Sequence, residues 1–302
     1  MAFDALRPFL LGDSEMRLAA LEGHAGTGKT WLVSRLLAGL PRGLKIAVAA
    51  PTNKAVRVLR DKLVEAGVAC REPDFFDRYP QPGCTCRSIH SFLGIKVEEL
   101  ADGRQRAVAA DPRGLRLSDF DAAVIDECSM IGAGLFEQIV SGSGRMPVLF
   151  VGDPAQLPPV EDARISPAFD RVGFRVRLSS VIRQARDNPI IRLSIRLRQM
   201  VEAGIKAGAL DLLDALPPAG DGSKAALVAG TPQTLVDWLL DQRASDPDGD
   251  ARIIAYTNAR VMEYNRRVHR ALHADSETRF APGERAIVNK GCSALRWEAP
   301  FF

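Results

Sequence analysis

The 302-residue sequence has no apolar run that reaches the roughly 18 residues of a membrane-spanning helix. Its N-terminus also lacks the basic start and the apolar stretch of a secretory signal peptide. Both absences argue against a membrane-embedded or exported chain. We therefore expect a cytoplasmic protein with no membrane partner.

Cysteine is also scarce, because the five cysteines are scattered and odd in number. This usage argues against a disulfide-stapled scaffold and favours reduced thiols. A zinc site is conceivable from a cluster of four residues, namely Cys70, Cys84, Cys86 and His90. A C-x-C spacing is not one of the usual zinc-ligand pairs, so metal binding by this cluster is the less favoured interpretation.

The net charge of +3 is too small to indicate nucleic-acid binding by itself, and we find no internal repeat and no low-complexity tract. The composition, 46% apolar and 25% charged, is that of an ordinary globular protein. At this length the chain can hold one large domain or two of ordinary size.

The sequence does contain a complete phosphate-binding loop, since residues 23–30 read GHAGTGKT and match G-x-x-x-x-G-K-[ST]. An apolar segment at 18–21 predicts a strand before it, and the helical repeat at 31–37 predicts a helix after it. In that context backbone N–H groups and the helix N-terminus surround a polyphosphate. A glycine-rich turn without a ligand is the alternative, and both flanking elements argue against it.

We therefore predict ATP as a cofactor. Lys29 would reach the outer phosphates, and the Thr30 hydroxyl would bind Mg²⁺. The predicted nucleotide-binding residues are Gly23, Ala25, Gly26, Thr27, Gly28, Lys29 and Thr30.

Apolar segments alternate with helical patterns along the chain and predict an α/β fold. Further strands are expected at 45–50, 122–125, 148–151, 176–178 and 252–256, and helices at 2–11, 55–65, 189–204, 232–243 and 258–272. Pro8 is expected to break or bend the first helix, and Trp238 is expected in the core. Residues 68–86 are interpreted as irregular, and 95–108 as a hairpin around Asp102-Gly103. Such a parallel sheet carries helices on both faces and binds ligands at the C-terminal ends of its strands.

An acidic pair, Asp126-Glu127, directly follows one of these strands. Beside a phosphate-binding loop, Asp126 would hold Mg²⁺ and Glu127 would orient and deprotonate the attacking water. The alternative is an acidic pair that caps a helix at Ser129.

Several further stretches resemble the successive motifs of superfamily 1B DNA helicases, and the RecD-like and Dda-like members are the most similar. The stretches are PTNKA at 51–55, SIHS at 88–91, VIDECSM at 124–130, GDPAQLPPV at 152–160, LSSVIRQ at 178–184 and AYTN at 255–258. The resemblance covers nearly the whole chain, and residues 152–160 are its most specific part.

The resemblance implies roles for residues that spacing alone does not assign. Gln156 would sense the γ-phosphate and couple it to DNA, and Arg183 would act as an arginine finger from a second motor domain. With Lys29, Asp126 and Glu127 they complete the expected catalytic set. The residues implied along the single-stranded DNA path are Pro51, Thr52, Asn53, Ser88, His90, Thr257 and Asn258.

Plainer interpretations stay open for some of these residues. His90 could be a satisfied core histidine, and Arg183 could form a surface ion pair. The arginines within 192–198 and 260–270 suit a solvated helix face as well as a DNA-facing one, because basic residues are common without phosphates.

The implied organisation is a first RecA-like motor domain at 1–180, with a small hairpin insertion at 94–117, and part of a second RecA-like domain at 181–302. The sequence departs from the family pattern in three ways. It begins downstream of the position at which the family carries a glutamine that reads adenine, and Ser180 stands where an acidic residue is often found before the motif arginine. The later motif that grips DNA and the later arginine motif of the second motor domain are not found. We therefore expect a truncated form that binds ATP and single-stranded DNA, hydrolyses ATP slowly and does not unwind a tailed duplex alone.

The expected parent function is an ATP-dependent helicase that translocates 5′ to 3′ on single-stranded DNA and acts on forked or tailed duplexes. The alternative is a nucleotide-gated single-stranded DNA-binding module with little ATPase and no unwinding. A P-loop ATPase acting on proteins or small molecules does not account for residues 152–160.

Overall fold

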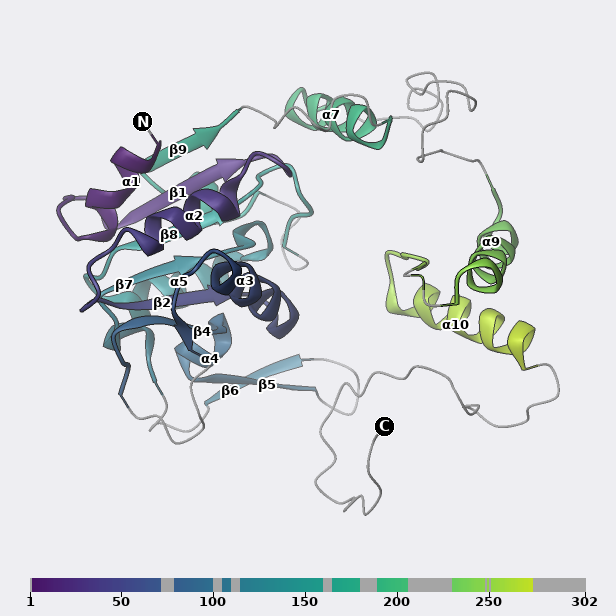
Figure 1. Cartoon of the computed structure of the whole chain (residues 1–302), viewed down its shortest axis with the longest axis horizontal. Coiled ribbons are helices and arrows are strands. Elements are labelled where there is room, and N and C mark those ends of the chain that lie inside the picture. Colours follow the sequence, from purple (N-terminus) through teal and green to yellow (C-terminus); the bar gives the residue numbers. More distant parts are fainter. Residues whose placement is uncertain are drawn as a thin grey trace, which may run out of the picture. The chain divides into compact units, whose positions relative to one another are not determined.

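The structure is a computed structural model that describes residues 2–71, 79–99, 105–109, 115–159, 165–179, 189–205, 230–247, 249 and 251–273 (Figure 1). The chain divides into two compact units, residues 1–226 and 227–302. Each unit is described by itself. The domain boundary expected at residue 180 falls within a segment outside the described residues and stays a prediction.

The first unit is built on a seven-stranded sheet whose paired strands all run parallel, in the order β3-β4-β2-β7-β8-β1-β9. The strands are β1 (Leu18–Gly23), β2 (Lys45–Ala50), β3 (Cys70–Arg71), β4 (Gly83–Ser88), β7 (Ala122–Ile125), β8 (Val148–Gly152) and β9 (Phe174–Leu178). This arrangement confirms the predicted α/β fold with a parallel sheet.

The central strands are apolar along their whole length, as expected for strands covered on both faces. Every residue of β7 and β8 is buried, whereas β9 at the edge alternates between half-buried and exposed positions. One buried cluster draws on α1 (Ala2–Leu10), α2 (Lys29–Ala38) and α3 (Asn53–Glu65), and a second draws on α4 (Ile89–Leu93), α5 (Ala133–Ser143) and α6 (Pro167–Asp170). The sheet therefore carries a helical layer on each face (Figure 1).

The helices predicted at 2–11, 31–37, 55–65 and 189–204 are present and begin and end within two residues of those positions, whereas α4, α5 and α6 were not predicted. The helix in the last of these ranges is α7 (Pro189–Glu202), and the first unit also contains short 3-10 turns η1 (Leu117–Asp119) and η2 (Cys128–Met130). Pro8 lies inside α1 and does not end it. In the described part of the chain, no helix is long and apolar enough to cross a membrane.

The interpretation of residues 68–86 as irregular is wrong at both described ends. β4 pairs in parallel with β2 over its full length, and β3 pairs with β4. Cys84, Thr85 and Cys86 are buried in the sheet. The apolar run in this segment is only Cys84-Thr85-Cys86 and lies among Pro and Gly residues, so the sequence gives little indication of a strand. The run becomes a buried strand because β2 and β3 pair with it.

Strands β3 and β4 bring three thiols together, because Cys70 is in register with Cys84, and Cys86 lies on the same face of β4. Hydrogen bonds from Cys84 and Cys86 lower the pKa of Cys70 to about 4, and those bonds and burial raise the pKa values of the two donors. Across the described residues, no three His, Cys, Asp or Glu side chains are arranged to hold a metal ion.

The predicted hairpin is present as β5 (Ile95–Glu99) and β6 (Gln105–Ala109), which pair antiparallel as a separate two-stranded sheet (Figure 1). Its turn lies outside the described residues. The hairpin follows α4 directly, so it branches from the edge of the parallel sheet at which β4 ends.

The described residues of the second unit contain two helices, α9 (Pro232–Ser245) and α10 (Asn258–Leu272). The Thr231 hydroxyl caps α9 by accepting the Thr234 N–H at 3.3 Å. The predicted strand at 252–256 is wrong, because residues 230–247 and 251–273 supply no strand to pair with it, and Ile254 and Tyr256 are each 93% exposed. Trp238 is 47% exposed, so its placement in the core is also wrong.

Candidate nucleotide and DNA sites

The predicted functional residues that the structure describes in the first unit follow strands whose C-terminal ends lie along one edge of the parallel sheet. The register pairs residues at or near the C-terminal ends of neighbouring strands, with Glu22 opposite Gly152, Ile125 opposite Phe150, and Ala50 opposite Ser88. Each strand therefore delivers the segment that follows it to the same edge. Along that edge the order is β4, β2, β7, β8 and β1.

The phosphate-binding loop joins β1 to α2 and has the backbone that the motif requires. Gly26 and Gly28 have φ of 79° and 84°, in the left-handed region that other residues rarely adopt. A Cβ at Gly23 would lie 2.5 Å from Thr27 Oγ1, whereas one at Gly26 would meet nothing within 4 Å. The loop is thus closed on its inner side and open at its mouth, which suits a phosphate ligand.

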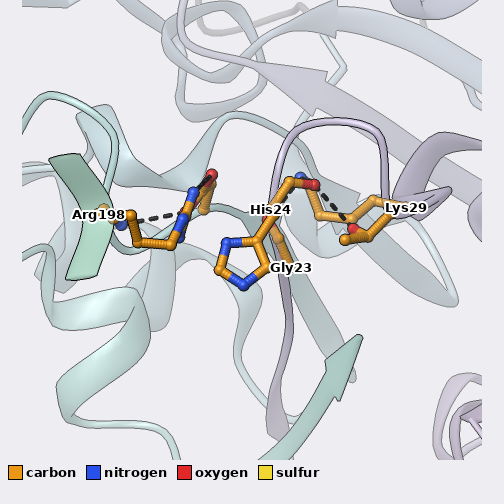
Figure 2. Close-up of polar contacts among 7 residues, drawn as sticks. Gly23, His24, Lys29 and Arg198 are labelled. Atoms are coloured by element: carbon orange, nitrogen blue, oxygen red, sulfur yellow. Dashed lines mark hydrogen bonds and ion pairs between the residues drawn. The ribbon is translucent and has the colours of Figure 1, made fainter. Parts of the chain in front are cut away.

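Lys29, the first residue of α2, turns its side chain back over the loop (Figure 2). Its Nζ donates to the Gly23 carbonyl at 2.7 Å and to the His24 carbonyl at 3.0 Å. Burial lowers the pKa of Lys29, against the opposing effect of Asp153, Asp126 and Glu127. These three carboxylates and the ammonium group therefore share one small region.

Asp126 and Glu127 follow β7 as predicted, and neither caps a helix. Asp126 Oδ1 accepts the Glu127 backbone N–H at 2.9 Å, and Glu127 precedes η2 without a side-chain capping bond. The structure therefore does not support the capping alternative. Burial raises the pKa of Asp126 to about 6, as expected where a cation would normally balance a buried carboxylate.

Glu127 has φ of 55° and ψ of 38°, and it alone among the described non-glycine residues has a positive φ. Residues held in such conformations cluster at functional sites, where the surrounding structure offsets a cost of about 1–3 kcal/mol. Two residues later, Ser129 Oγ is buried and lacks a hydrogen-bond partner among the described residues. The segment that follows β7 thus contains a strained backbone at Glu127, the candidate base, and an unsatisfied hydroxyl at Ser129.

Asp153, the second residue of the GDPAQ stretch, forms an ion pair with Arg198, one of the arginines that the sequence left open between a solvated and a DNA-facing helix face. Arg198 on α7 donates to both carboxylate oxygens, with Nη1 2.7 Å from Oδ1. Burial raises the pKa of Asp153. The hydrogen bonds from Arg198 and the Ala155 N–H, together with the positive charges of Arg198 and Lys29, lower it by a larger amount, so the pKa of Asp153 is below its usual value. Arg198 therefore belongs neither to a solvated face nor to a DNA-facing one.

The remaining catalytic predictions divide between the described and the undescribed parts of the chain. Gln156 follows β8 in the same loop as Asp153, is exposed, and donates its backbone N–H to the Asp153 carbonyl at 3.1 Å. Arg183 lies outside the described residues, and so do Val160 and most of the LSSVIRQ stretch. The assigned roles of Gln156 and Arg183 stay predictions.

Replacing Arg198 with methionine should lower the free energy of unfolding by about 3 kcal/mol, because it leaves the buried Asp153 carboxylate without its partner. Urea unfolding of Arg198→Met measures this change. Arg196→Met on the exposed side of the same helix is the matched control and should change the free energy of unfolding by less than about 0.5 kcal/mol. Equal stability of the two variants would contradict a stabilising role for the pair.

The predicted DNA residues of the first unit occupy the ends of β2 and β4. Pro51 leads into Thr52, whose hydroxyl caps α3 by accepting the Ala55 N–H at 3.2 Å. Asn53 is exposed on the first turn of α3. This helix starts two residues earlier than predicted, because the Thr52 cap satisfies its first N–H groups.

Ser88 caps α4 in the same way, by accepting the Ser91 N–H at 3.3 Å. His90 is half-buried, and burial lowers its pKa, which favours a neutral imidazole. In the second unit, Thr257 caps α10 and is followed by the exposed Asn258. The Thr257 cap has the same backbone conformation as the Thr52 cap, with φ near −120° and ψ of 150° at both positions.

A basic cavity of about 510 Å³ lies between α3 and the end of β4. Three arginines line it, Arg57, Arg60 and Arg87, and none of its lining residues is acidic. Its remaining lining residues are Asn53, Val56, Cys86, Ser88 and Ser91. Because Asn53 and Ser88 belong to the predicted DNA path, the basic cavity extends that path with positive charge that the sequence did not indicate.

Comparison with known proteins places this arrangement in a family. A family model described as an AAA domain matches residues 9–215. The chain is 29% identical over 179 residues to the ATP-dependent RecD2 DNA helicase of Deinococcus radiodurans, covering 58% of this chain and 21% of that protein. It is 32% identical over 207 residues to the RecBCD enzyme subunit RecD of Mycobacterium tuberculosis, covering 61% and 33%.

Among solved structures, the chain is similar to a Pif1 helicase from Bacteroides, with 21% identity, a TM-score of 0.46, and coverage of 88% of this chain and 55% of that one. The chain thus spans between a fifth and a third of the length of these two curated relatives. The family match covers more than half of the chain and includes the phosphate-binding loop, the acidic pair and the GDPAQ stretch. The chain therefore belongs to the AAA-domain family.

Proposed function

We propose that this chain is the ATP-hydrolysing and DNA-binding part of a superfamily 1B helicase that moves 5′ to 3′ along single-stranded DNA. The observation that carries the proposal is the order of strand ends along one edge of the sheet. β1, β7 and β8 present the nucleotide residues, and β2 and β4 present the DNA residues. β2 pairs directly with β7, so the two sets are neighbours in one rigid sheet.

In the nucleotide half, the loop N–H groups and Lys29 bind the phosphates of ATP. Thr30 at the start of α2 and Asp126 at the end of β7 supply hard oxygen ligands, which fit Mg²⁺. When bound, Mg²⁺ neutralises charge on the β- and γ-phosphates. Glu127 accepts the proton of the attacking water, and Gln156 senses the γ-phosphate from the adjacent loop.

In the DNA half, Thr52, Asn53, Ser88 and His90 contact the backbone of the single strand. The basic cavity beside them adds charge that can neutralise phosphates without reading bases. Pro51 sets the turn from β2 into α3, and Thr257 and Asn258 would contact the strand from the second unit. Arg183 would complete the charge stabilisation of the γ-phosphate. Forked or tailed duplexes are the proposed physiological substrates.

The direct test is ATP hydrolysis with and without oligo(dT). We expect single-stranded DNA to stimulate turnover by the wild-type chain and not by Lys29→Ala, which loses a cation from the phosphate site. DNA binding without stimulated turnover would contradict the proposal and would favour a nucleotide-gated binding module.

A further inference from the structure

The first turn of α2 carries a large aromatic side chain that the proposed function does not use. Trp31 directly follows Thr30 and is 66% exposed, whereas most of α2 packs into the core. The buried residues of this helix are Leu32, Val33, Ser34, Leu36 and Leu37. The helix therefore turns one face to the sheet and leaves the indole on the side that faces solvent.

The position of Trp31 directs its side chain toward the phosphate-binding loop. Helical side chains tilt toward the N-terminus, so each covers the surface over the preceding turn. For Trp31 that turn is the loop itself. A nucleotide whose phosphates occupy the loop has only the ribose between its α-phosphate and its base, so its base lies within reach of a side chain at the start of α2.

One face of the indole is already matched with a cation. Arg35, one turn further along α2, places its guanidinium carbon 5.6 Å from the centre of the Trp31 ring. Such a cation–π pair stabilises one orientation of the ring. An aromatic ring that is braced on one side and largely exposed to solvent is suited to stack on a flat, uncharged ring.

We propose that Trp31 is a stacking platform for the nucleobase of the bound nucleoside triphosphate, braced by Arg35. The proposal rests on the proposed nucleotide site and adds its base-recognition element. Stacking reads the π-face of a base and not its hydrogen-bonding edge. The site should consequently bind nucleoside triphosphates much more tightly than inorganic triphosphate, but should bind ATP and GTP with similar affinity.

Calorimetric titration of the full chain with Mg-ATP and with inorganic triphosphate tests the proposal. Trp31→Ala should weaken ATP binding roughly 5- to 150-fold, the range observed when a stacking aromatic is truncated. Triphosphate affinity should change less than about twofold, and this unchanged affinity also shows that the loop is folded. Trp31→Phe should recover most of the ATP affinity, and Trp238→Ala, at another exposed tryptophan, should bind both ligands as the wild type does.

The possible outcomes distinguish failure of the stacking role of Trp31 from failure of the nucleotide site itself. Equal ATP affinity in the wild type and Trp31→Ala would overturn the stacking role alone. Equal weakening of both ligands would also overturn it, because Trp31 would then support the loop and not the base. Failure of the wild type to bind either ligand would overturn the nucleotide site, and the stacking proposal with it.

Discussion

Glu127→Gln is expected to slow ATP hydrolysis by about 10²- to 10⁴-fold, the usual contribution of a general base. The amide keeps the shape of the side chain but cannot accept the proton of the attacking water. ATP affinity should stay close to that of the wild type, because Lys29 and the loop N–H groups are unchanged. Phosphate release with saturating oligo(dT) and calorimetric ATP binding measure the two quantities.

The matched control is Glu137→Gln, which removes a carboxylate from an exposed ion pair with Arg171 on the surface. This variant should hydrolyse ATP at the wild-type rate. Comparable rates for the wild type and Glu127→Gln would remove Glu127 from the base role. A parallel loss of ATP binding would instead assign Glu127 to holding the loop together.

The second large effect is expected from the three arginines of the basic cavity. If Arg57, Arg60 and Arg87 each neutralise one phosphate, replacing all three with alanine should reduce the salt slope for single-stranded DNA by about 2. When salt is raised from 50 to 200 mM, the affinity of the wild type for single-stranded DNA should therefore fall roughly 20-fold more than that of the triple variant. Fluorescence anisotropy with labelled oligonucleotides over a salt series measures the slope.

The control removes two exposed arginines that precede strands and therefore lie near the N-terminal ends of the strands, away from the basic cavity. Arg42→Ala/Arg145→Ala takes away one arginine shortly before β2 and one shortly before β8. This variant should keep the wild-type slope. A slope unaffected by the triple substitution, or affected equally by the control, would place the DNA elsewhere on the molecule.

His90 and Asn53 should behave differently from the arginines in the same experiment. Because burial favours the neutral form of His90, His90→Ala should weaken DNA binding without a large change in salt slope. Asn53→Ala should do the same. Both should act about equally on oligonucleotides of different sequence, since backbone contacts carry no base information.

Much of the first unit could be predicted from the sequence because its signals are local. The apolar runs at 45–50 and 122–125 form strands within those limits. The phosphate-binding loop is set by glycines whose backbone conformations other residues rarely adopt. Strand, loop and helix are adjacent in the chain there, so the conformation of the loop is specified by local sequence.

Where a segment depends on a distant partner, the sequence was insufficient. β4 is a strand because β2 and β3 pair with it and α3 covers it, and its own residues carry only a weak signal. Residues 252–256 show the reverse case, since a strong apolar pattern stays unpaired in the described part of the second unit.

The sequence by itself therefore determined the nucleotide chemistry and the order of the motifs, because those depend on residue identity and short spacing. Only the tertiary structure decided which side chains from distant segments act together. It paired Arg198 with Asp153 across 45 positions, gathered the arginines of the basic cavity from α3 and β4, and left Trp31 exposed beside the loop. Charge and burial act through space, so these groupings depend on how the chain is folded.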